Sequence, residues 1–113
     1  MPDKTIIGLT EKVTLFSPKG KKQYLARIDT GATKSSLDAV LVAQLELGPI
    51  VSSRMVKSAH GNRLRPVIEA EIEIAGKRIK EKFTLAERDH MNYKILIGQN
   101  ILIKGFLIDP SKP

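Results

Sequence analysis

The chain has 113 residues, of which 42% are hydrophobic, and it carries a net charge of +7 and no cysteine. This length suits one domain, expected over residues 1–113, and the absence of cysteine excludes a disulfide framework or a thiolate metal site. No apolar run is long enough to cross a bilayer, and residues 1–9 lack a signal-peptide pattern, so we expect a cytoplasmic protein without a membrane partner.

Most of the chain is predicted to form strands. Between residues 64 and 74, apolar residues at every second position alternate with glutamates, which indicates one buried face and one face in water. The other strand-like segments are short apolar runs that end at turn residues. The expected strands cover residues 13–17, 24–28, 50–59, 64–74, 79–85, 93–97 and 106–109. Regularly spaced strands of this kind predict an all-β fold with a closed or nearly closed barrel.

One helix is expected among the strands, over residues 38–46. Asp38 can cap its first turn by accepting main-chain N–H groups, and Gly48-Pro49 stops it. The apolar stripe of this helix is predicted to consist of Val40, Leu41, Leu45 and Leu47. A brief helical turn is also expected over residues 100–103.

Asp29-Thr30-Gly31-Ala32 is the motif with the clearest chemical meaning. An apolar strand ends there, and the chain then presents a carboxylate on a loop of small residues. Gly31 permits a close approach of main chains, and Thr30 supplies a hydroxyl. The tripeptide alone is a weak signal, because it occurs by chance in about a few per cent of chains of this length. An Asp in an ordinary turn therefore remains an alternative.

Features downstream strengthen the catalytic interpretation. A hairpin tipped by residues 59–62 is followed by an apolar run that ends at Gly98 and by a short helix, and this order resembles the retropepsins. The chain is similar in more detail to small retropepsin-like proteins that carry the label ATP-dependent zinc protease. These proteins are associated with RimK-type ATP-grasp ligases, which add glutamate to proteins. The similar segments are residues 7–11, 26–32, 35–37, 84–88 and 95–102.

This resemblance implies an all-β acid-protease barrel with one short helix that works as a homodimer. Each copy would contribute Asp29, supported by Thr30 and Gly31, and the two carboxylates would share one proton and activate water for peptide-bond hydrolysis. This aspartic endopeptidase chemistry needs no cofactor. Ala32 offers these carboxylates no hydroxyl, so we expect a less acidic activity maximum than that of pepsin-like enzymes. A non-catalytic peptide-binding or dimerisation module of the same fold is the alternative.

The sequence departs from the retropepsin pattern beside this loop. Thr33 and Gln99 stand where retropepsins commonly carry an Asp and an Arg that form an ion pair. Both charges are missing together, so neither is left buried and unpaired, and a neutral hydrogen bond between the two side chains is feasible. Gly98, Gln99 and Asn100 are expected to be structural residues near the site.

Substrate contacts are predicted at Ala32 in the loop and at the hairpin tip, where they would come from His60, Gly61, Asn62 and Arg63. The basic hairpin favours an acidic peptide or protein as substrate, although an ordinary solvated hairpin is the alternative. No aromatic residues lie among these basic residues, so a nucleic-acid partner is not favoured.

A metal site is not expected. The sequence has no HExxH motif, and Asp89 and His90 could supply only two ligands, whereas a catalytic zinc needs three.

Overall fold

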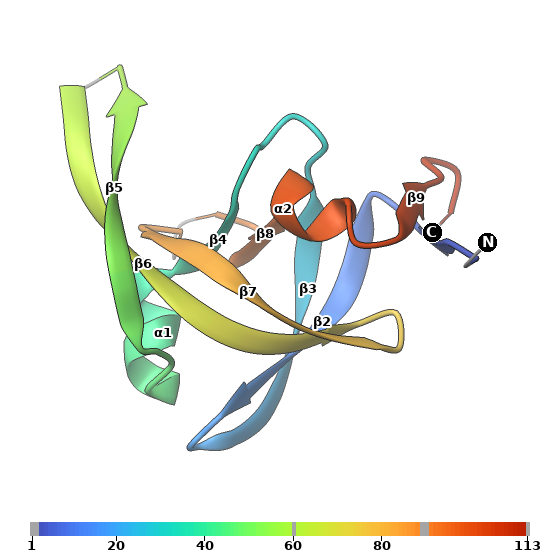
Figure 1. Ribbon diagram of the computed structural model, residues 1–113, viewed down its shortest axis with the longest axis horizontal. Helices are drawn as coiled ribbons and strands as arrows, with labels where there is room; N and C mark the ends of the chain where they lie inside the picture. Colours follow the sequence, from blue (N-terminus) through green and yellow to red (C-terminus); the bar gives the residue numbers. More distant parts are fainter. Residues whose placement is uncertain (1–2, 60, 89–90, 113) are drawn as a thin grey trace.

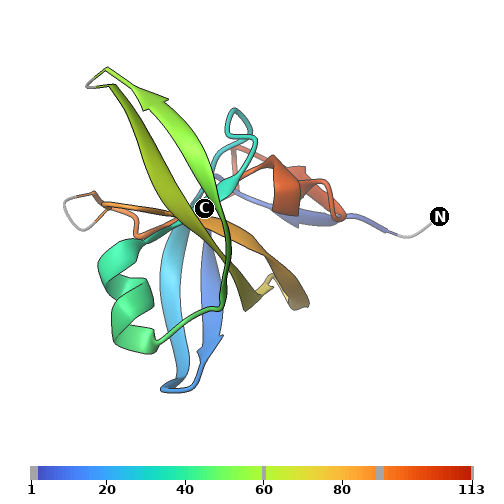
Figure 2. The same cartoon turned by 60° about the vertical axis from the view of Figure 1, so that its left-hand side comes forward.

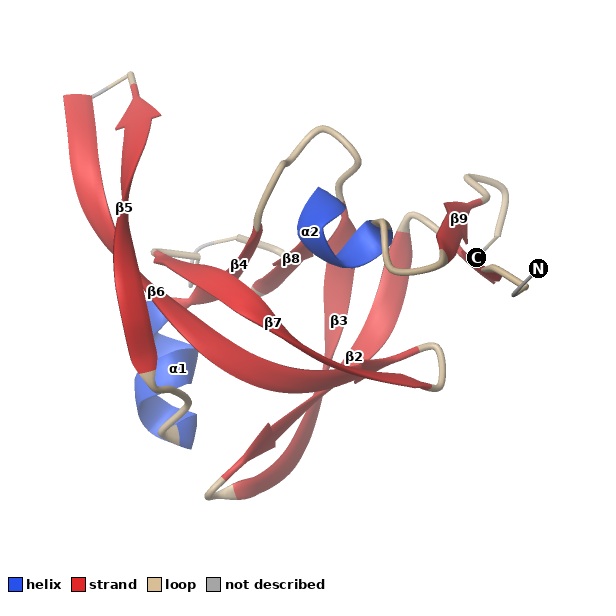
Figure 3. Ribbon diagram, viewed as in Figure 1, coloured by secondary structure: helices blue, strands red, loops and turns tan. Residues whose placement is uncertain are grey.

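The computed structural model describes residues 3–59, 61–88 and 91–112, and strands dominate it (Figures 1 and 3). Within these ranges lie nine strands and two short helices. In chain order they are β1 (Thr5–Ile7), β2 (Thr10–Ser17), β3 (Gly20–Ile28), β4 (Ser35–Asp38), α1 (Ala39–Leu45), β5 (Ile50–Ser58), β6 (Gly61–Ile74), β7 (Lys77–Ala86), β8 (Ile95–Ile97), α2 (Gln99–Leu102) and β9 (Phe106–Ile108). None of the described helices is long and apolar enough to cross a membrane.

The barrel predicted from the sequence is confirmed. Strands β2, β3, β8, β4, β7 and β6 are hydrogen-bonded in this order, and β2 also pairs with β6, which closes the ring. β5 stands outside the ring and pairs with β6 alone, so the two strands form a long hairpin. β1 and β9 form a separate parallel pair in which Ile6 lies opposite Leu107. The two ends of the chain therefore lie on one side of the barrel (Figure 1).

The alternation predicted in β6 is confirmed and shows where the core lies. Ile68, Ile72 and Ile74 have no exposed surface, whereas the glutamates between them face outward. Burial of the aliphatic side chains is the main stabilising contribution in a small domain of this kind. The interior of the barrel is therefore a packed core, mostly aliphatic, with Phe83 among its fully buried side chains.

Helix α1 begins as predicted. The Asp38 carboxylate accepts the Leu41 N–H at 3.1 Å, and the helix ends at Glu46, whose φ of 54° is left-handed. The predicted stripe is wrong at Val40, which is 51% exposed. Val42 takes its place against the barrel, since residues 41, 42 and 45 share one face of a helix.

Two strands were not predicted, β1 and β4. β4 is a short Ser-Ser-Leu-Asp segment without a strand pattern, and it lies between β7 and β8, with which it pairs on its two edges. Such pairing with distant residues can override a weak local preference.

Candidate active site

Asp29 follows β3 directly at the end of the barrel. β3 pairs in parallel with β8, and the Asp29 N–H continues this ladder by donating to the Ile97 carbonyl at 2.9 Å. The chain then turns, with the Ala32 N–H 3.3 Å from the Asp29 carbonyl oxygen. Ile28 is buried, whereas Asp29 is partly exposed. The barrel therefore fixes the Asp29 main chain and leaves its carboxylate accessible.

Gly31 orients that carboxylate. Its N–H donates to Oδ1 of Asp29 at 2.9 Å. A Cβ at position 31 would lie 3.3 Å from the same oxygen, which is tighter than ordinary van der Waals contact. The small residue therefore lets the main chain hold the side chain of Asp29 in one orientation.

Gln99 holds the same loop from the other side. Its side-chain Nε2 donates to the Thr30 carbonyl at 2.7 Å, and its main-chain N–H donates to the Ala32 carbonyl at 2.8 Å. The next N–H, of Asn100, donates to the Thr33 carbonyl at 3.3 Å. The sequence suggested a hydrogen bond between the side chains of Gln99 and Thr33. In the structure, the Gln99 side chain bonds the main chain at Thr30 instead. An uncharged side chain here ties the loop to α2 without an ion pair.

Gly98 is buried and packs directly against the loop. A Cβ at this position would overlap the Lys34 carbonyl and lie 2.8 Å from the Ala32 oxygen. The Gly98 N–H donates to Oγ of Ser35 at 2.9 Å. Only glycine fits this contact without moving the loop that carries Asp29.

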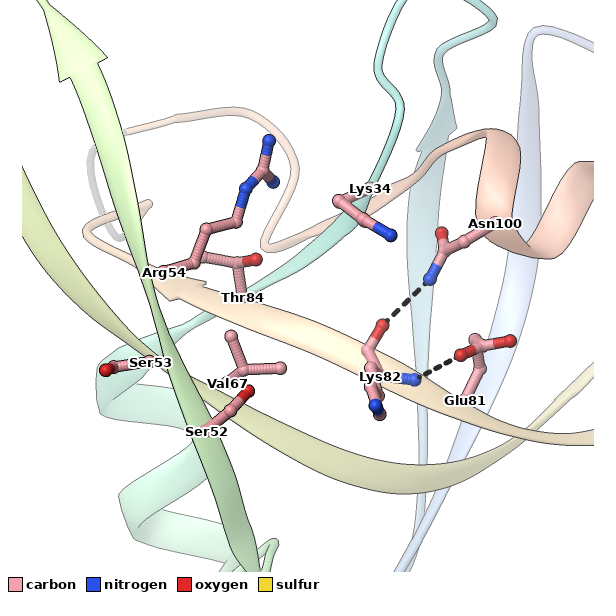
Figure 4. A pocket seen from close by; sticks show the side chains of 9 residues that line it. All are labelled: Lys34, Ser52, Ser53, Arg54, Val67, Glu81, Lys82, Thr84 and Asn100. Atoms are coloured by element: carbon pink, nitrogen blue, oxygen red, sulfur yellow. Dashed lines mark hydrogen bonds between the residues drawn. The ribbon is translucent and has the colours of Figure 1, made fainter.

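A buried hydroxyl connects these segments to the next strand. Ser35 has no exposed surface, and its Oγ donates to Oδ1 of Asn100 at 2.7 Å. Asn100 in turn donates through Nδ2 to the Lys82 carbonyl on β7 at 3.0 Å (Figure 4). Asn100 was among the predicted structural residues. Ser35 was not among them, because the sequence does not show which of the two adjacent serines is buried.

The β5–β6 hairpin projects from the barrel (Figures 1 and 2). Gly61 and Asn62 lie near its tip, and His60 lies outside the described residues. At the base of the hairpin, the register of β5 shifts between Ile50 and Ser52, close to Pro66 on the facing strand.

The basic residues of the hairpin are not all available to a ligand. The Arg63 guanidinium lies 3.2 Å from the Glu87 carboxylate, and that of Arg65 lies 3.7 Å from it. Glu87 follows β7, so the two pairs link the hairpin to the barrel. They also partly neutralise the positive charge that the sequence predicted there.

Two neighbouring cavities lie between the hairpin and the barrel residues that face it. They have volumes of about 280 and 220 Å³, and Lys34, Arg54 and Thr84 line both of them. Figure 4 shows the first cavity, with Ser52 and Arg54 of β5 on one side and Lys34 and Asn100 on the other. Their combined size suits side chains of an extended peptide.

Arg27 is close to Asp29, and it was not predicted from the sequence as a residue of the site. It precedes Asp29 by two residues, and successive strand residues point to opposite faces. Ala26 and Ile28 are buried, so Arg27 lies on the outer face of β3, the face toward which Asp29 continues. A single Arg in a strand gives no sign in the sequence that its side chain lies near a candidate catalytic Asp.

Arg88 approaches the same region from the loop after β7. Its N–H donates to Oδ1 of Asp38 at 2.9 Å, and its side-chain Nε donates to the Tyr93 carbonyl at 3.0 Å. Burial lowers the pKa of the Arg88 guanidinium from its ordinary value, while the charges of Asp38, Arg27 and Asp29 have smaller effects. A guanidinium remains charged at neutral pH despite such a change.

Metal ligands do not gather in the described part of the chain. The residues 3–59, 61–88 and 91–112 contain no group of three or more His, Cys, Asp or Glu side chains that could hold a metal ion. His60, Asp89 and His90 lie outside the described residues, so the expectation concerning them stays a prediction.

Comparison with known proteins gives matches in both sequence and structure. A family model described as "RimB-like: Retropepsin-like aspartic endopeptidase RimB" matches residues 41–113, a range that begins after the Asp29 loop. A "Probable alpha-L-glutamate ligase" of Shewanella pealeana is 31% identical over 97% of this chain, and one of Desulfotalea psychrophila is 26% identical over 96%. The chain spans 29% and 28% of the lengths of these two relatives.

Solved structures share the fold. Protein Lpg0085 of Legionella pneumophila, of unknown function, has a TM-score of 0.68 and 24% identity, covering 96% of this chain and 94% of that one. EIAV protease in complex with the inhibitor HBY-793 has a TM-score of 0.65 and 21% identity, covering 83% and 84%. The protease of Simian Foamy Virus has a TM-score of 0.61 and 16% identity, covering 83% and 91%.

Proposed function

The chain belongs to the RimB-like family of retropepsin-like aspartic endopeptidases, and on that basis we propose that it hydrolyses peptide bonds as a homodimer. Residues 1–113 would form one retropepsin-like domain, with Asp29 as its catalytic carboxylate. The observation that carries the proposal is the Asp29 loop, in which Gly31 orients the carboxylate and Gly98 and Gln99 fix the main chain. Such rigid placement of an accessible acid suits catalysis, which depends on positioning.

The mechanism requires a second copy, because the sequence has one Asp-Thr-Gly motif. Ile6 and Leu107 are register partners in the β1–β9 pair and are 53% and 51% exposed, and Ile103 at the end of α2 is 80% exposed. α2 begins at Gln99, which bonds the Asp29 loop, so Ile103 lies on an element next to the site, and β9 follows α2 in the chain. A twofold contact through them would bury apolar surface and bring the two loops together.

In the proposed dimer the two Asp29 side chains meet at the twofold axis. Carboxylates about 3 Å apart cannot both ionise, so the pair holds one proton. The ionised member takes a proton from water, and the water oxygen attacks the peptide carbonyl carbon. The protonated member donates a hydrogen bond to the carbonyl oxygen. The carboxyl group that took the proton from water then gives it to the leaving nitrogen as the bond between that nitrogen and the carbonyl carbon breaks.

The substrate peptide would lie between the β5–β6 hairpin and the barrel, along the two cavities lined by Lys34 and Arg54. Ala32 in the loop and Gly61, Asn62 and Arg63 near the hairpin tip are the proposed contacts, together with His60.

Replacing Asp29 with Asn tests this proposal. The variant keeps the size of the side chain but cannot act as the ionised member of the pair. We expect turnover of peptide substrates to fall by a factor of about 100 or more, the scale of lost acid–base catalysis. Asp3→Asn, an exposed change outside the site, is the matched control and should retain activity. Turnover that persists in Asp29→Asn at the level of the parent protein would contradict the proposal.

The same experiment distinguishes the peptidase from the alternative, which is a peptide-binding module without catalysis. Such a module would bind peptides equally well in the parent protein and in the Asp29→Asn variant, and neither form would cleave them. Sedimentation across protein concentrations supplies the second measurement, because a protein that stays monomeric cannot form the proposed pair of carboxylates.

A further inference from the structure

A third hollow on the molecule lies beside Asp29 and is separate from the cavities under the hairpin. It is a groove of about 380 Å³, and it shares no lining residue with those cavities. The described residues that line it are Arg27, Arg88, Met91, Asn92 and Tyr93. They include two guanidinium groups and no carboxylate.

Both arginines are placed close to the proposed reacting centre. Arg27 and Asp29 follow one face of the same chain segment, and residues two apart on a strand are separated by roughly 6.6 Å. Arg88 lines the same groove as Arg27. A carboxylate between the two guanidiniums would therefore lie about one residue of an extended peptide away from Asp29.

The groove is also preorganised for an anion. The Arg88 main chain is held by its bond to Asp38, and the bond from Nε to the Tyr93 carbonyl orients the guanidinium. The two Nη groups carry four further N–H donors in a planar fork that matches a carboxylate. Arg27 is exposed, so its side chain can adjust to a bound group.

We propose that this groove binds the substrate side chain next to the scissile bond and that Arg27 and Arg88 make it select an acidic residue. This inference rests on the proposed function, because the scissile bond is located by Asp29. Charge-assisted, bidentate hydrogen bonds favour Glu or Asp over the neutral amides, and a Lys side chain is repelled.

This groove differs from the basic hairpin as a source of specificity. Arg63 and Arg65 of the hairpin already lie against the Glu87 carboxylate. An acidic ligand there would compete with an internal partner. The described lining residues of the groove include no carboxylate, and the bond from Arg88 to Asp38 uses the main-chain N–H of Arg88.

The first experiment measures binding without turnover. The full-length Asp29→Asn protein is titrated with three peptides that differ only at one central position, which holds Glu, Gln or Lys. We expect the Glu peptide to bind about tenfold or more tightly than the Gln peptide, the scale of one charge-assisted hydrogen bond, and the Lys peptide to bind least. Equal affinities for Glu and Gln would overturn the proposal.

Variants then assign the effect to the groove. Arg27→Gln should bring the Glu-to-Gln affinity ratio toward one, and Arg27→Glu should reverse the preference between Glu and Lys. Lys22→Gln is the matched control, because it removes one positive charge from the opposite end of β3 and should keep the ratio. An unchanged ratio in Arg27→Gln would also overturn the proposal. Thermal melts show that each variant remains folded.

The final experiment exposes the same peptides to the parent protein and identifies products by mass spectrometry. Cleavage beside Glu at a higher kcat/KM than beside Gln supports the subsite. Equal cleavage beside both residues overturns the subsite and leaves the peptidase proposal standing. Selective binding of the Glu peptide without any cleavage keeps the acid-selective groove and overturns the peptidase proposal.

Discussion

The side-chain amide of Gln99 donates a 2.7 Å hydrogen bond to the Thr30 carbonyl, inside the loop that carries Asp29. Gln99 is exposed, so the bond contributes only about 0.5–1.5 kcal/mol to folding. Its main effect is to position the loop. We expect Gln99→Leu to lower kcat about tenfold while the free energy of unfolding falls by about 1 kcal/mol.

Gln99→Arg is the informative comparison, since it retains an N–H donor that can reach the Thr30 carbonyl. It should recover most of the activity that Gln99→Leu loses. Steady-state kinetics and urea denaturation of both variants provide the measurements. An unchanged kcat in Gln99→Leu would show that the bond does not position the loop.

Gly98→Ala should be strongly destabilising. The added Cβ would meet the carbonyls of Lys34 and Ala32, both of which are main-chain atoms. Overpacking of this kind costs about 1–3 kcal/mol, and relief would require the Asp29 loop to move. Urea denaturation at one fixed protein concentration measures the loss, because dimer formation also contributes to stability.

Gly48→Ala is the matched glycine control, since its Cβ would contact only the Ile50 nitrogen, at 3.7 Å. We expect this change to alter the free energy of unfolding by less than about 1 kcal/mol. Equal losses in the two variants would contradict the packing argument.

Asp38→Ala tests a second buried anchor. Asp38 is 1% exposed, and its carboxylate accepts the N–H groups of Leu41 and Arg88 at 3.1 and 2.9 Å. Alanine would remove the helix cap and leave the Arg88 N–H without this acceptor, at a combined cost of about 2–4 kcal/mol. Asp109→Ala, which removes an exposed acceptor for Ser111, should cost less than about 1 kcal/mol in the same denaturation experiment.

The dependence of activity on pH tests the proposed carboxylate pair. One member must be protonated and the other ionised, so kcat/KM should follow a bell-shaped profile. With Ala at position 32, we expect the maximum to lie above about pH 3. In Ala32→Ser a hydroxyl can donate to the ionised carboxylate and stabilise it, so the acidic limb should move to lower pH. A maximum below about pH 3 in the parent protein would contradict this expectation.

The individual strands of the barrel and the first turn of α1 were predictable because their signals are local. The alternation around Ile72 requires a half-buried strand, and Asp38 before an apolar stripe is a typical helix start. β4 has no such signal, because its strand conformation depends on pairing with residues about 50 positions away.

The site was predictable only in part, for a related reason. Asp29-Thr30-Gly31 is a recognisable string of residues, but the bonding partner of Gln99 depends on how two loops meet. The groove formed by Arg27 and Arg88 joins a strand to a loop some 60 residues later, and nothing in the sequence pairs these two residues. Charge near the hairpin suggested an acidic substrate, while the structure adds a second group of cations in a groove that shares no lining residue with the hairpin cavities.

One strand, β6, belongs both to the closed ring and to the projecting hairpin. Near the base of that hairpin, the irregularity in β5 and the missing N–H of Pro66 weaken the ladder at the same level. Bending costs least where cross-strand bonds are fewest, so the arm would bend about this point while the ring keeps its shape, and the movement would also break the contacts of Arg63 and Arg65 with Glu87. Admission of a long chain to the cleft would then require one hinge movement and no unfolding of the barrel.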